Sequence, residues 1–157
     1  MSTVMGIDLR SGAVADLPLV DRVMQAAFDT RFGEAWTHNQ VLGLMAMPGV
    51  WLTIAALGGE CAGFALSRCV LDEAELLLLA TAPSFRRRGV AAALLRAVIA
   101  DAVTQSAKSL HLEVRQGNEA IKLYQSEGFI KVGHRRDYYH GPAGQTFDAL
   151  TYRRDLS

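Results

Sequence analysis

The residues at positions 86–91 have the spacing that is most specific for a binding function. Three arginines precede Gly89, Ala91 follows two residues later, and this turn lies between the apolar run 76–80 and a stretch rich in alanine and leucine. Where a strand is followed by a glycine turn and then by a helix, the first N–H groups of that helix are unpaired and lie at the positive end of its dipole. Such a turn binds anions, and phosphates above all. The sequence therefore predicts that the chain holds a phosphorylated cofactor.

A carboxylate further along the chain could take part in proton transfer. Apolar and charged residues alternate over 110–115, so Glu113 is expected on the polar face of a strand, pointing into a cleft. A carboxylate placed there can accept a proton, directly or through water. An ion pair of Glu113 with Arg115 or Lys131 is the alternative. Glu75, at the start of the preceding strand, is the rival base.

Composition excludes several classes of function. The 157 residues fit a single domain, 1–157, and 16 basic against 16 acidic residues give no net field that would recruit nucleic acid or a membrane surface. The longest apolar run is too short to span a bilayer, and residues 1–9 lack the pattern of a secretory signal. We therefore expect a cytoplasmic chain in which Cys61 and Cys69, too far apart along one strand for a disulfide, are reduced thiols. The scattered histidines predict no metal site.

The elements that must position these residues follow from periodicity and turn signals. Asp16 is expected to cap the first helix, and Asn118 a short late one that ends at Gly128. The order of the elements indicates a mixed α/β sheet. Helices are expected over 16–28 and 37–46, after Gly89, and after Asn118; strands are expected over 50–57, 61–70, 74–81, 110–115, 129–139 and 145–154, with a further possible strand over 5–10.

With these elements placed, the chain resembles the GNAT superfamily of acyl-CoA-dependent N-acyltransferases. The turn at 86–91 resembles the family's Q/R-x-x-G-x-G/A pyrophosphate loop, with Ala91 in the last small-residue position. The run L-Y-x-x-x-G-F at 123–129 resembles its late helix and following strand, and the element order matches over essentially the whole chain. The resemblance implies a mixed central sheet of about seven strands, flanked by about four helices and splayed between the fourth and fifth strands.

Within this superfamily the chain is most similar to the ribosomal-protein alanine N-acetyltransferase branch. The spacing between Asn118 and Tyr124 is one residue shorter than usual in that branch. The resemblance implies direct transfer of an acetyl group from acetyl-CoA to a primary amine in a ternary complex, with the N-terminal alanine of a ribosomal protein as the expected acceptor. The matching segments are 35–37, 112–115, Asn118, 123–124, 135–139 and 147–150.

The resemblance also implies roles for individual residues. Backbone N–H groups of the loop would hold the pyrophosphate, with Arg86 or Arg87 beside its charge, and the backbone of 79–81 would pair with the pantetheine amides. Glu113 would be the general base, and Tyr124 would protonate the departing thiolate. The expected cofactor-binding residues are Leu79, Ala80, Thr81, Arg86, Arg87, Arg88, Gly89, Val90, Ala91, Ala92, Asn118 and Tyr124, and the expected acceptor-site residues are Phe32, Trp36, Tyr138 and Tyr139.

The kind of amine is the remaining choice. Deprotonating an α-amine of pKa about 7.8 at pH 7 costs about 1 kcal/mol, whereas a lysine of pKa about 10.4 costs about 4.6 kcal/mol. One carboxylate and water therefore favour a protein N-terminus. A small-molecule amine acetyltransferase is the alternative, because acceptor specificity lies in variable loops, and a non-catalytic acyl-CoA-binding sensor is a third reading. The expected partners are acetyl-CoA and a protein N-terminus or small amine. No nucleic acid, membrane or metal is expected to bind. The chain is expected to be a monomer or a weak homodimer.

Overall fold

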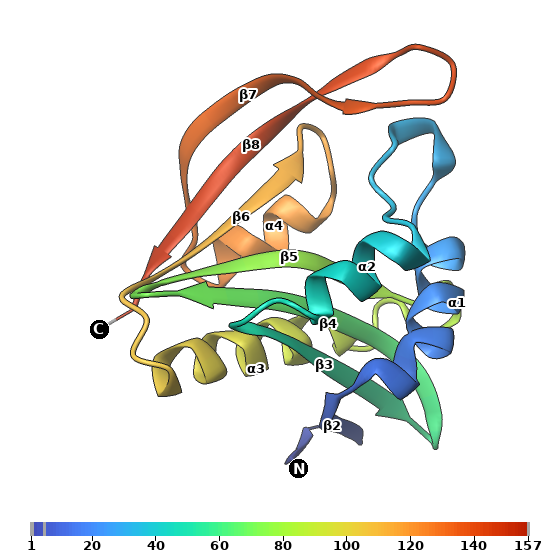
Figure 1. The fold of residues 1–157 in the computed structure, drawn as a ribbon, viewed down its shortest axis with the longest axis vertical. Coiled ribbons are helices and arrows are strands. Elements are labelled where there is room, and N and C mark those ends of the chain that lie inside the picture. Colours follow the sequence, from blue (N-terminus) through green and yellow to red (C-terminus); the bar gives the residue numbers. More distant parts are fainter. Residues whose placement is uncertain (1, 5, 157) are drawn as a thin grey trace.

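The computed structural model describes residues 2–4 and 6–156, which form one mixed sheet with helices on both faces (Figure 1). The strand order is β1-β2-β3-β4-β5-β6-β8-β7. The strands are β1 (Ser2–Val4), β2 (Ile7–Gly12), β3 (Val50–Leu57), β4 (Glu60–Val70), β5 (Glu73–Thr81), β6 (Ser109–Arg115), β7 (Ile130–His140) and β8 (Thr146–Asp155). The helices are α1 (Leu17–Ala27), α2 (His38–Met45), α3 (Val90–Thr104) and α4 (Ala120–Ser126).

These elements confirm the mixed α/β class and differ from the expected bounds by a few residues. The sheet contains the expected seven strands and the three-residue β1 at its edge. The possible strand over 5–10 begins at Met5, which lies outside the described residues, and β2 continues to Gly12. Thr37 begins α2 with a capping box, in which its hydroxyl accepts the N–H of Gln40 at 3.2 Å.

The prediction that the side chain of Asp16 caps the first helix is wrong. Asp16 does precede α1, but its carboxylate lies 2.7 Å from the guanidinium of Arg10 and accepts the N–H of Ala13 at 2.9 Å. The hydrogen bond from Arg10 lowers the pKa of Asp16 to about 2. The guanidinium, which comes from the neighbouring strand β2, thus takes the place of the helix N–H groups as the partner of this carboxylate.

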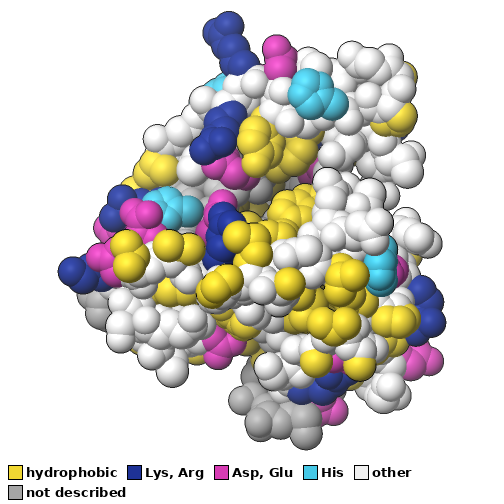
Figure 2. All heavy atoms as spheres, viewed as in Figure 1, with side chains coloured by type: hydrophobic (Ala, Val, Ile, Leu, Met, Phe, Trp, Pro, Cys, Tyr) yellow, Lys and Arg dark blue, Asp and Glu magenta, His cyan; other side chains and the backbone are white. Residues whose placement is uncertain are grey.

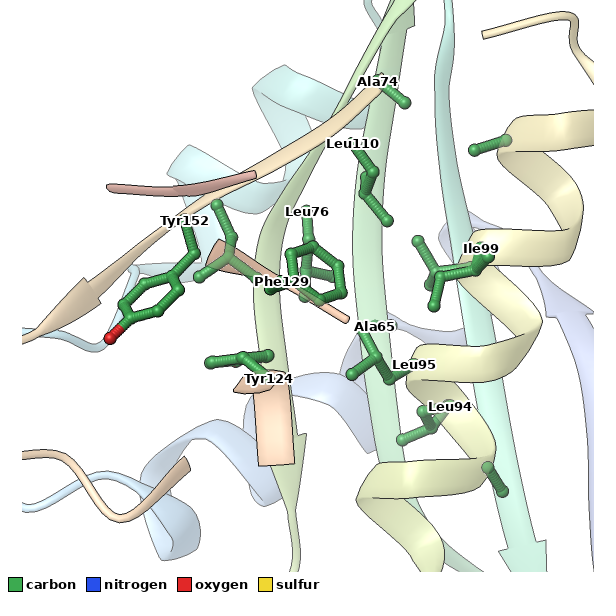
Figure 3. Packing of buried hydrophobic residues seen from close by; sticks show 14 of the residues in the cluster. Ala65, Ala74, Leu76, Leu94, Leu95, Ile99, Leu110, Tyr124, Phe129 and Tyr152 are labelled. Atoms are coloured by element: carbon green, nitrogen blue, oxygen red, sulfur yellow. The ribbon is translucent and has the colours of Figure 1, made fainter. Parts of the chain in front are cut away.

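Two hydrophobic layers cover the two faces of the sheet. On one face, Leu94, Leu95 and Val98 of α3 are fully buried, and Figure 3 shows α3 side chains pointing toward the strands. On the other face, α1 and α2 pack over Phe64 and Leu66 of β4. Successive side chains of a strand point to opposite faces, so alternating residues of β4 belong to the two layers. This burial fixes the central strands, and with them the framework of the site.

Strands β5 and β6 separate partway along their length. Their parallel pairing covers Glu73–Leu76 against Ser109–Leu112, whereas β5 stays paired with β4 as far as Thr81. The register between β4 and β5 shifts beside Leu77, which indicates a bulge where the separation begins. On its β6 side, the backbone of residues 77–81 pairs with no strand in the described part of the chain. The expected splay is therefore confirmed, because β5 and β6 are the fourth and fifth strands when the short β1 is left out.

Two other findings bear on the sequence predictions. Cys61 and Cys69 are both free thiols on β4. Over the described ranges 2–4 and 6–156, none of the helices is long and apolar enough to cross a membrane.

Candidate functional site

A cleft of about 790 Å³ opens where β5 and β6 separate. It runs from the turn at 86–91, which we call the donor loop, along the unpaired edge of β5, to the segment 28–37 between α1 and α2, which we call the acceptor loop. Figure 1 shows the acceptor loop facing the tip of the β7–β8 hairpin. Most of the residues predicted from the sequence line this cleft: Phe32, Trp36, Glu75, Leu79, Ala80, Thr81, Arg86, Arg87, Ala91, Glu113, Asn118, Tyr124, Tyr138 and Tyr139.

The donor loop has the backbone of an anion-binding turn. Arg87 and Gly89 both have positive φ, at +62° and +83°, and Gly89 is the N-cap of α3. The first N–H groups of α3 therefore point out of the helix without intrahelical partners. A Cβ at Gly89 would meet no protein atom within 4 Å, so within the protein the left-handed backbone is what requires glycine. Four of the expected donor residues, Arg88, Gly89, Val90 and Ala92, belong to this loop and helix start but not to the cleft lining.

The arginines of the donor loop are not equivalent. The Nη2 of Arg86 donates to the backbone carbonyl of Ala27 at 2.8 Å, which ties the donor loop to the end of α1. The guanidinium of Arg88 lies 5.6 Å from the centre of the Phe85 ring. Arg86 and Arg87 were both expected beside the pyrophosphate charge. Arg87 lines the cleft and does not make the hydrogen bond to α1 that Arg86 makes.

Glu113 lies just past the last paired residues of β5 and β6, where the cleft opens. Its Oε1 is 3.2 Å from the Nε of Arg135, and its Oε2 accepts the hydroxyl of Thr151 at 2.7 Å. The side chain is 15% exposed, and each carboxylate oxygen keeps a further lone pair. The alternative ion pair with Arg115 or Lys131 is wrong: Glu113 pairs with Arg135, and Arg115 is held by a different carboxylate.

The rival carboxylate, Glu75, is less suited to proton transfer in the cleft. Its Oε1 lies 2.7 Å from the Nη2 of Arg68 on the neighbouring strand β4. It also lies opposite His111, within the stretch where β5 and β6 are still hydrogen-bonded together. Glu75 touches the cleft, but it sits before the strands separate, whereas Glu113 sits after that point. The geometry therefore favours Glu113.

Tyr124 reaches the cleft from α4. It is 6% exposed, and its ring packs edge-on against Phe129 at 5.9 Å between centres. Burial, aided by the charge of Glu34, raises the pKa of Tyr124 well above its ordinary value. The phenol therefore stays protonated through the physiological range, the form that can donate a proton.

Aromatic rings line the far end of the cleft. Phe32 packs edge-on against Phe147 of β8 at 5.0 Å between centres, which ties the acceptor loop to the hairpin. Tyr138 and Tyr139 also pack edge-on, at 5.0 Å. Burial is the main cause that raises the pKa of Tyr139, whose hydroxyl donates to the carbonyl of Glu113 at 3.5 Å. This end of the cleft thus combines aromatic rings with the hydroxyl of Tyr139 beside the backbone of Glu113.

The sequence predictions missed Glu34, a partly buried carboxylate of the acceptor loop. Its Oε1 lies 3.2 Å from the Nε of Arg115, and its Oε2 accepts the side-chain amide of Asn118 at 3.2 Å. The only local signal is a lone acid two residues before Trp36. Its partners lie 81 and 84 residues away, so no local pattern could have found them.

The prediction that Asn118 caps the short late helix is off by one residue, because the N-cap of α4 is Glu119, whose side chain makes no capping hydrogen bond. From the position just before the N-cap, the Oδ1 of Asn118 accepts the N–H of Ala120, the first residue of the helix, at 2.8 Å. The side-chain amide of Asn118 donates to the acceptor loop, so this residue joins both sides of the cleft entrance.

Two glycines let the acceptor loop approach the hairpin closely. A Cβ at Gly33, where φ is +65°, would collide with the carbonyl oxygen of His140, and one at Gly141 would collide with that of Arg31. We expect Gly33→Ala to destabilise the protein by about 1–3 kcal/mol, through the strained φ and the clash. For a chain of this size that lowers the melting temperature by about 2–4 °C per kcal/mol, measured by calorimetry.

The matched control for this variant is Gly43→Ala. Gly43 lies within α2, and a Cβ there meets no atom within 4 Å, so alanine should leave the stability equal or raise it. If Gly33→Ala melts no lower than Gly43→Ala, the contact between the acceptor loop and the hairpin does not hold in solution.

No group of three or more histidine, cysteine, aspartate or glutamate side chains among the described residues is arranged to hold a metal ion. The groups best placed for chemistry along the cleft are the free N–H groups at the start of α3, the carboxylate of Glu113 and the protonated phenol of Tyr124. Such a set can hold an anionic cofactor and transfer protons at two points near the other end.

Comparison with known proteins agrees with this geometry. The sequence model of the acetyltransferase (GNAT) family matches residues 19–129. A ribosomal protein bS18-alanine N-acetyltransferase from Salmonella typhimurium is 46% identical over 146 residues, which are 92% of this chain and 95% of that protein. The N-alpha-acetyltransferase RimI of Mycobacterium tuberculosis is 37% identical over 135 residues, 83% of this chain and 73% of that protein. The crystal structure of the ribosomal-protein-S18-alanine N-acetyltransferase from Escherichia coli matches with a TM-score of 0.85 at 30% identity, covering 96% of this chain and 94% of that one.

Proposed function

The chain belongs to the acetyltransferase (GNAT) family and is an acetyl-CoA-dependent N-acetyltransferase; we propose that it acts on a protein N-terminus, with the N-terminal alanine of ribosomal protein bS18 as acceptor. The observation that supports the proposal most is the continuous cleft from the donor loop to Glu113 and Tyr124. It joins a place for an anionic donor to two groups that can move protons. The bS18 relatives suggest the acceptor.

The residues on the donor side fit the co-substrate. The N–H groups at the start of α3 would hold the pyrophosphate, with the charge of Arg87 at the cleft wall. The unpaired backbone of 79–81 would pair with the amides of the pantetheine arm, as an added strand pairs with a sheet edge. This arrangement leads the thioester toward the point where β5 and β6 separate, next to Glu113.

Two side chains of the cleft each carry out one proton transfer. Glu113 accepts a proton from the ammonium or attacking amine, directly or through water, and the free amine nitrogen forms a bond to the acetyl carbon. The carbon–sulfur bond breaks, and Tyr124 donates its phenolic proton to the departing sulfur. The transfer is direct, because Cys61 and Cys69 on β4 do not line the cleft.

Charge and shape at the acceptor end support a chain terminus as the substrate. The acceptor loop and the hairpin meet over the end of the cleft, at Gly33 and Gly141. Basic and histidine side chains are exposed on β7, among them Arg135 and Arg136, and Figure 2 shows such side chains at the β7–β8 end of this face. Acidic positions of a partner protein could dock there while its terminal amine enters the cleft.

A direct assay tests the proposed function. The protein is incubated with acetyl-CoA and a peptide that begins with alanine; we expect release of free thiol and a peptide heavier by one acetyl group at its α-amine. The same peptide with a blocked N-terminus and an internal lysine should not react. If only polyamines or other small amines turn over, the acceptor claim fails. Tight CoA binding without turnover of any amine would instead support a sensor.

A pair of glycine variants tests the donor loop. Gly89 and Gly59 both have φ of +83° and open space where a Cβ would lie, but Gly59 is in the β3–β4 turn, away from the cleft. Alanine at either site should cost similar stability, because the backbone penalty is the same. Only Gly89→Ala should weaken acetyl-CoA binding, by about 10- to 100-fold if one or two charge-assisted hydrogen bonds are lost, as measured by calorimetric titration. Equal affinities for the two variants would contradict the assignment of this loop to the donor.

A further inference from the structure

The carboxylate of Glu34 is held from two directions. Arg115, the last residue of β6, approaches one oxygen, and Asn118, just before α4, donates to the other, each at 3.2 Å. The Glu34 side chain is 10% exposed and the Arg115 side chain 15%. At this burial an ion pair is screened less by solvent than a surface pair is. The acceptor loop is therefore fastened to the opposite wall of the cleft through one side chain.

The two partners of Glu34 lead to the two residues that we assign to proton transfer. Arg115 follows Glu113 by two positions on β6, so both side chains lie on the same face of that strand. Asn118 lies in the turn that starts α4, the helix that carries Tyr124. A displacement of Glu34 would thus be passed to the end of β6 and to the start of α4 at once.

The ring of Phe32 reinforces this connection. The guanidinium of Arg115 lies 3.7 Å from the centre of the Phe32 ring, two residues before Glu34 in the acceptor loop. Arg115 therefore contacts the loop by an ion pair and by a cation–π interaction. The charge of Glu34 also favours the protonated form of the Tyr124 phenol, after burial, which is the larger effect.

We propose that Glu34 is a positioning residue of the transfer reaction: through Arg115 and Asn118 it holds Glu113 and Tyr124 in the arrangement that transfer requires. The inference rests on the proposed function. Both carboxylate oxygens of Glu34 are occupied by protein donors. Its effect should therefore appear in kcat rather than in the binding of either substrate.

The test compares Glu34→Gln with Glu127→Gln. Glu127 gives a matched control, because its carboxylate is 14% exposed and lies 3.0 Å from the guanidinium of Arg96, outside the cleft. For each variant kcat and KM with an alanine-starting peptide, the acetyl-CoA dissociation constant and the melting temperature are measured. We expect Glu34→Gln to lower kcat about 10- to 100-fold, the loss of one or two hydrogen bonds to a charged group, with both binding constants changed less than about threefold. Glu127→Gln should lower only the melting temperature.

A second variant guards against a simple loss of folding. Arg115→Gln should reproduce the fall in kcat, and the double variant should lose little more than the larger single loss, because both changes break one connection. Unchanged acetyl-CoA affinity shows that each variant is folded. The inference is overturned if Glu34→Gln has the kcat of Glu127→Gln, or if its whole effect lies in the peptide KM. Absence of turnover by the unaltered protein would instead contradict the proposed function itself.

Discussion

Replacing Glu113 with glutamine is expected to lower kcat by about 10²- to 10⁴-fold, the range that a general base contributes. Glutamine has nearly the same shape and can still accept the hydroxyl of Thr151, which now bonds Oε2 at 2.7 Å. It cannot take the proton of the incoming amine. Affinity for acetyl-CoA should stay within about twofold, because Glu113 lies at the acceptor end of the cleft. Steady-state kinetics with an alanine-starting peptide and calorimetric titration of acetyl-CoA give the two numbers.

The comparison that decides the identity of the base is Glu75→Gln. Glu75 lines the same cleft but is bonded to Arg68 at 2.7 Å and precedes the separation of β5 and β6. Its replacement should therefore cost much less than that of Glu113. If Glu75→Gln has the larger effect, the base has been assigned to the wrong strand.

Replacing Tyr124 with phenylalanine should lower kcat by about 10²-fold or more, since the departing thiolate then loses its proton donor. The ring still fills its place against Phe129, so the melting temperature should change little. Tyr152→Phe is the matched control: Tyr152 is a tyrosine of similar burial, at 4% exposed, and does not line the cleft. Equal rates for Tyr124→Phe and Tyr152→Phe would remove Tyr124 from the reaction.

The pH dependence of the unaltered enzyme follows from the same residue. Burial raises the pKa of Tyr124 above the ordinary tyrosine value of about 10. The protonated phenol is the active form, so activity that depends on it is kept below the raised pKa and is lost only as the pH rises through it. We therefore expect that kcat does not fall, as the pH is raised to about 10, through ionisation of this tyrosine. A decline near pH 8 that disappears in Tyr124→Phe would contradict this.

The parts of the fold that could be predicted are those set by local patterns. The apolar run at 74–81 gave the buried strand β5, Thr37 and Gln40 form the capping box that begins α2, and Gly89 marks the start of α3. Each of these three predictions depends on residues that are close together in the sequence. The separation of β5 and β6, which places Glu113 beside the open edge of β5, was implied by the resemblance to the GNAT superfamily and not by any local pattern.

The contacts that could not be predicted join segments far apart in the sequence. Glu34 bonds to Arg115 and Asn118, and Arg86 to the carbonyl of Ala27 across 59 residues. For the same reason the sequence offered Arg115 or Lys131 as the partner of Glu113, where the sheet places Arg135 instead. Charge alone cannot choose among several arginines; strand register and loop packing make that choice.

The measurement that tests the central claim most directly is mass spectrometry of protein N-termini from cells with and without this gene. We predict that the alanine N-terminus of ribosomal protein bS18 is acetylated when the gene is present and free when it is absent. Expression of the unaltered chain should restore the acetyl group, and expression of Glu113→Gln should not. If that N-terminus carries the same acetylation in both cells, the proposed acceptor is wrong.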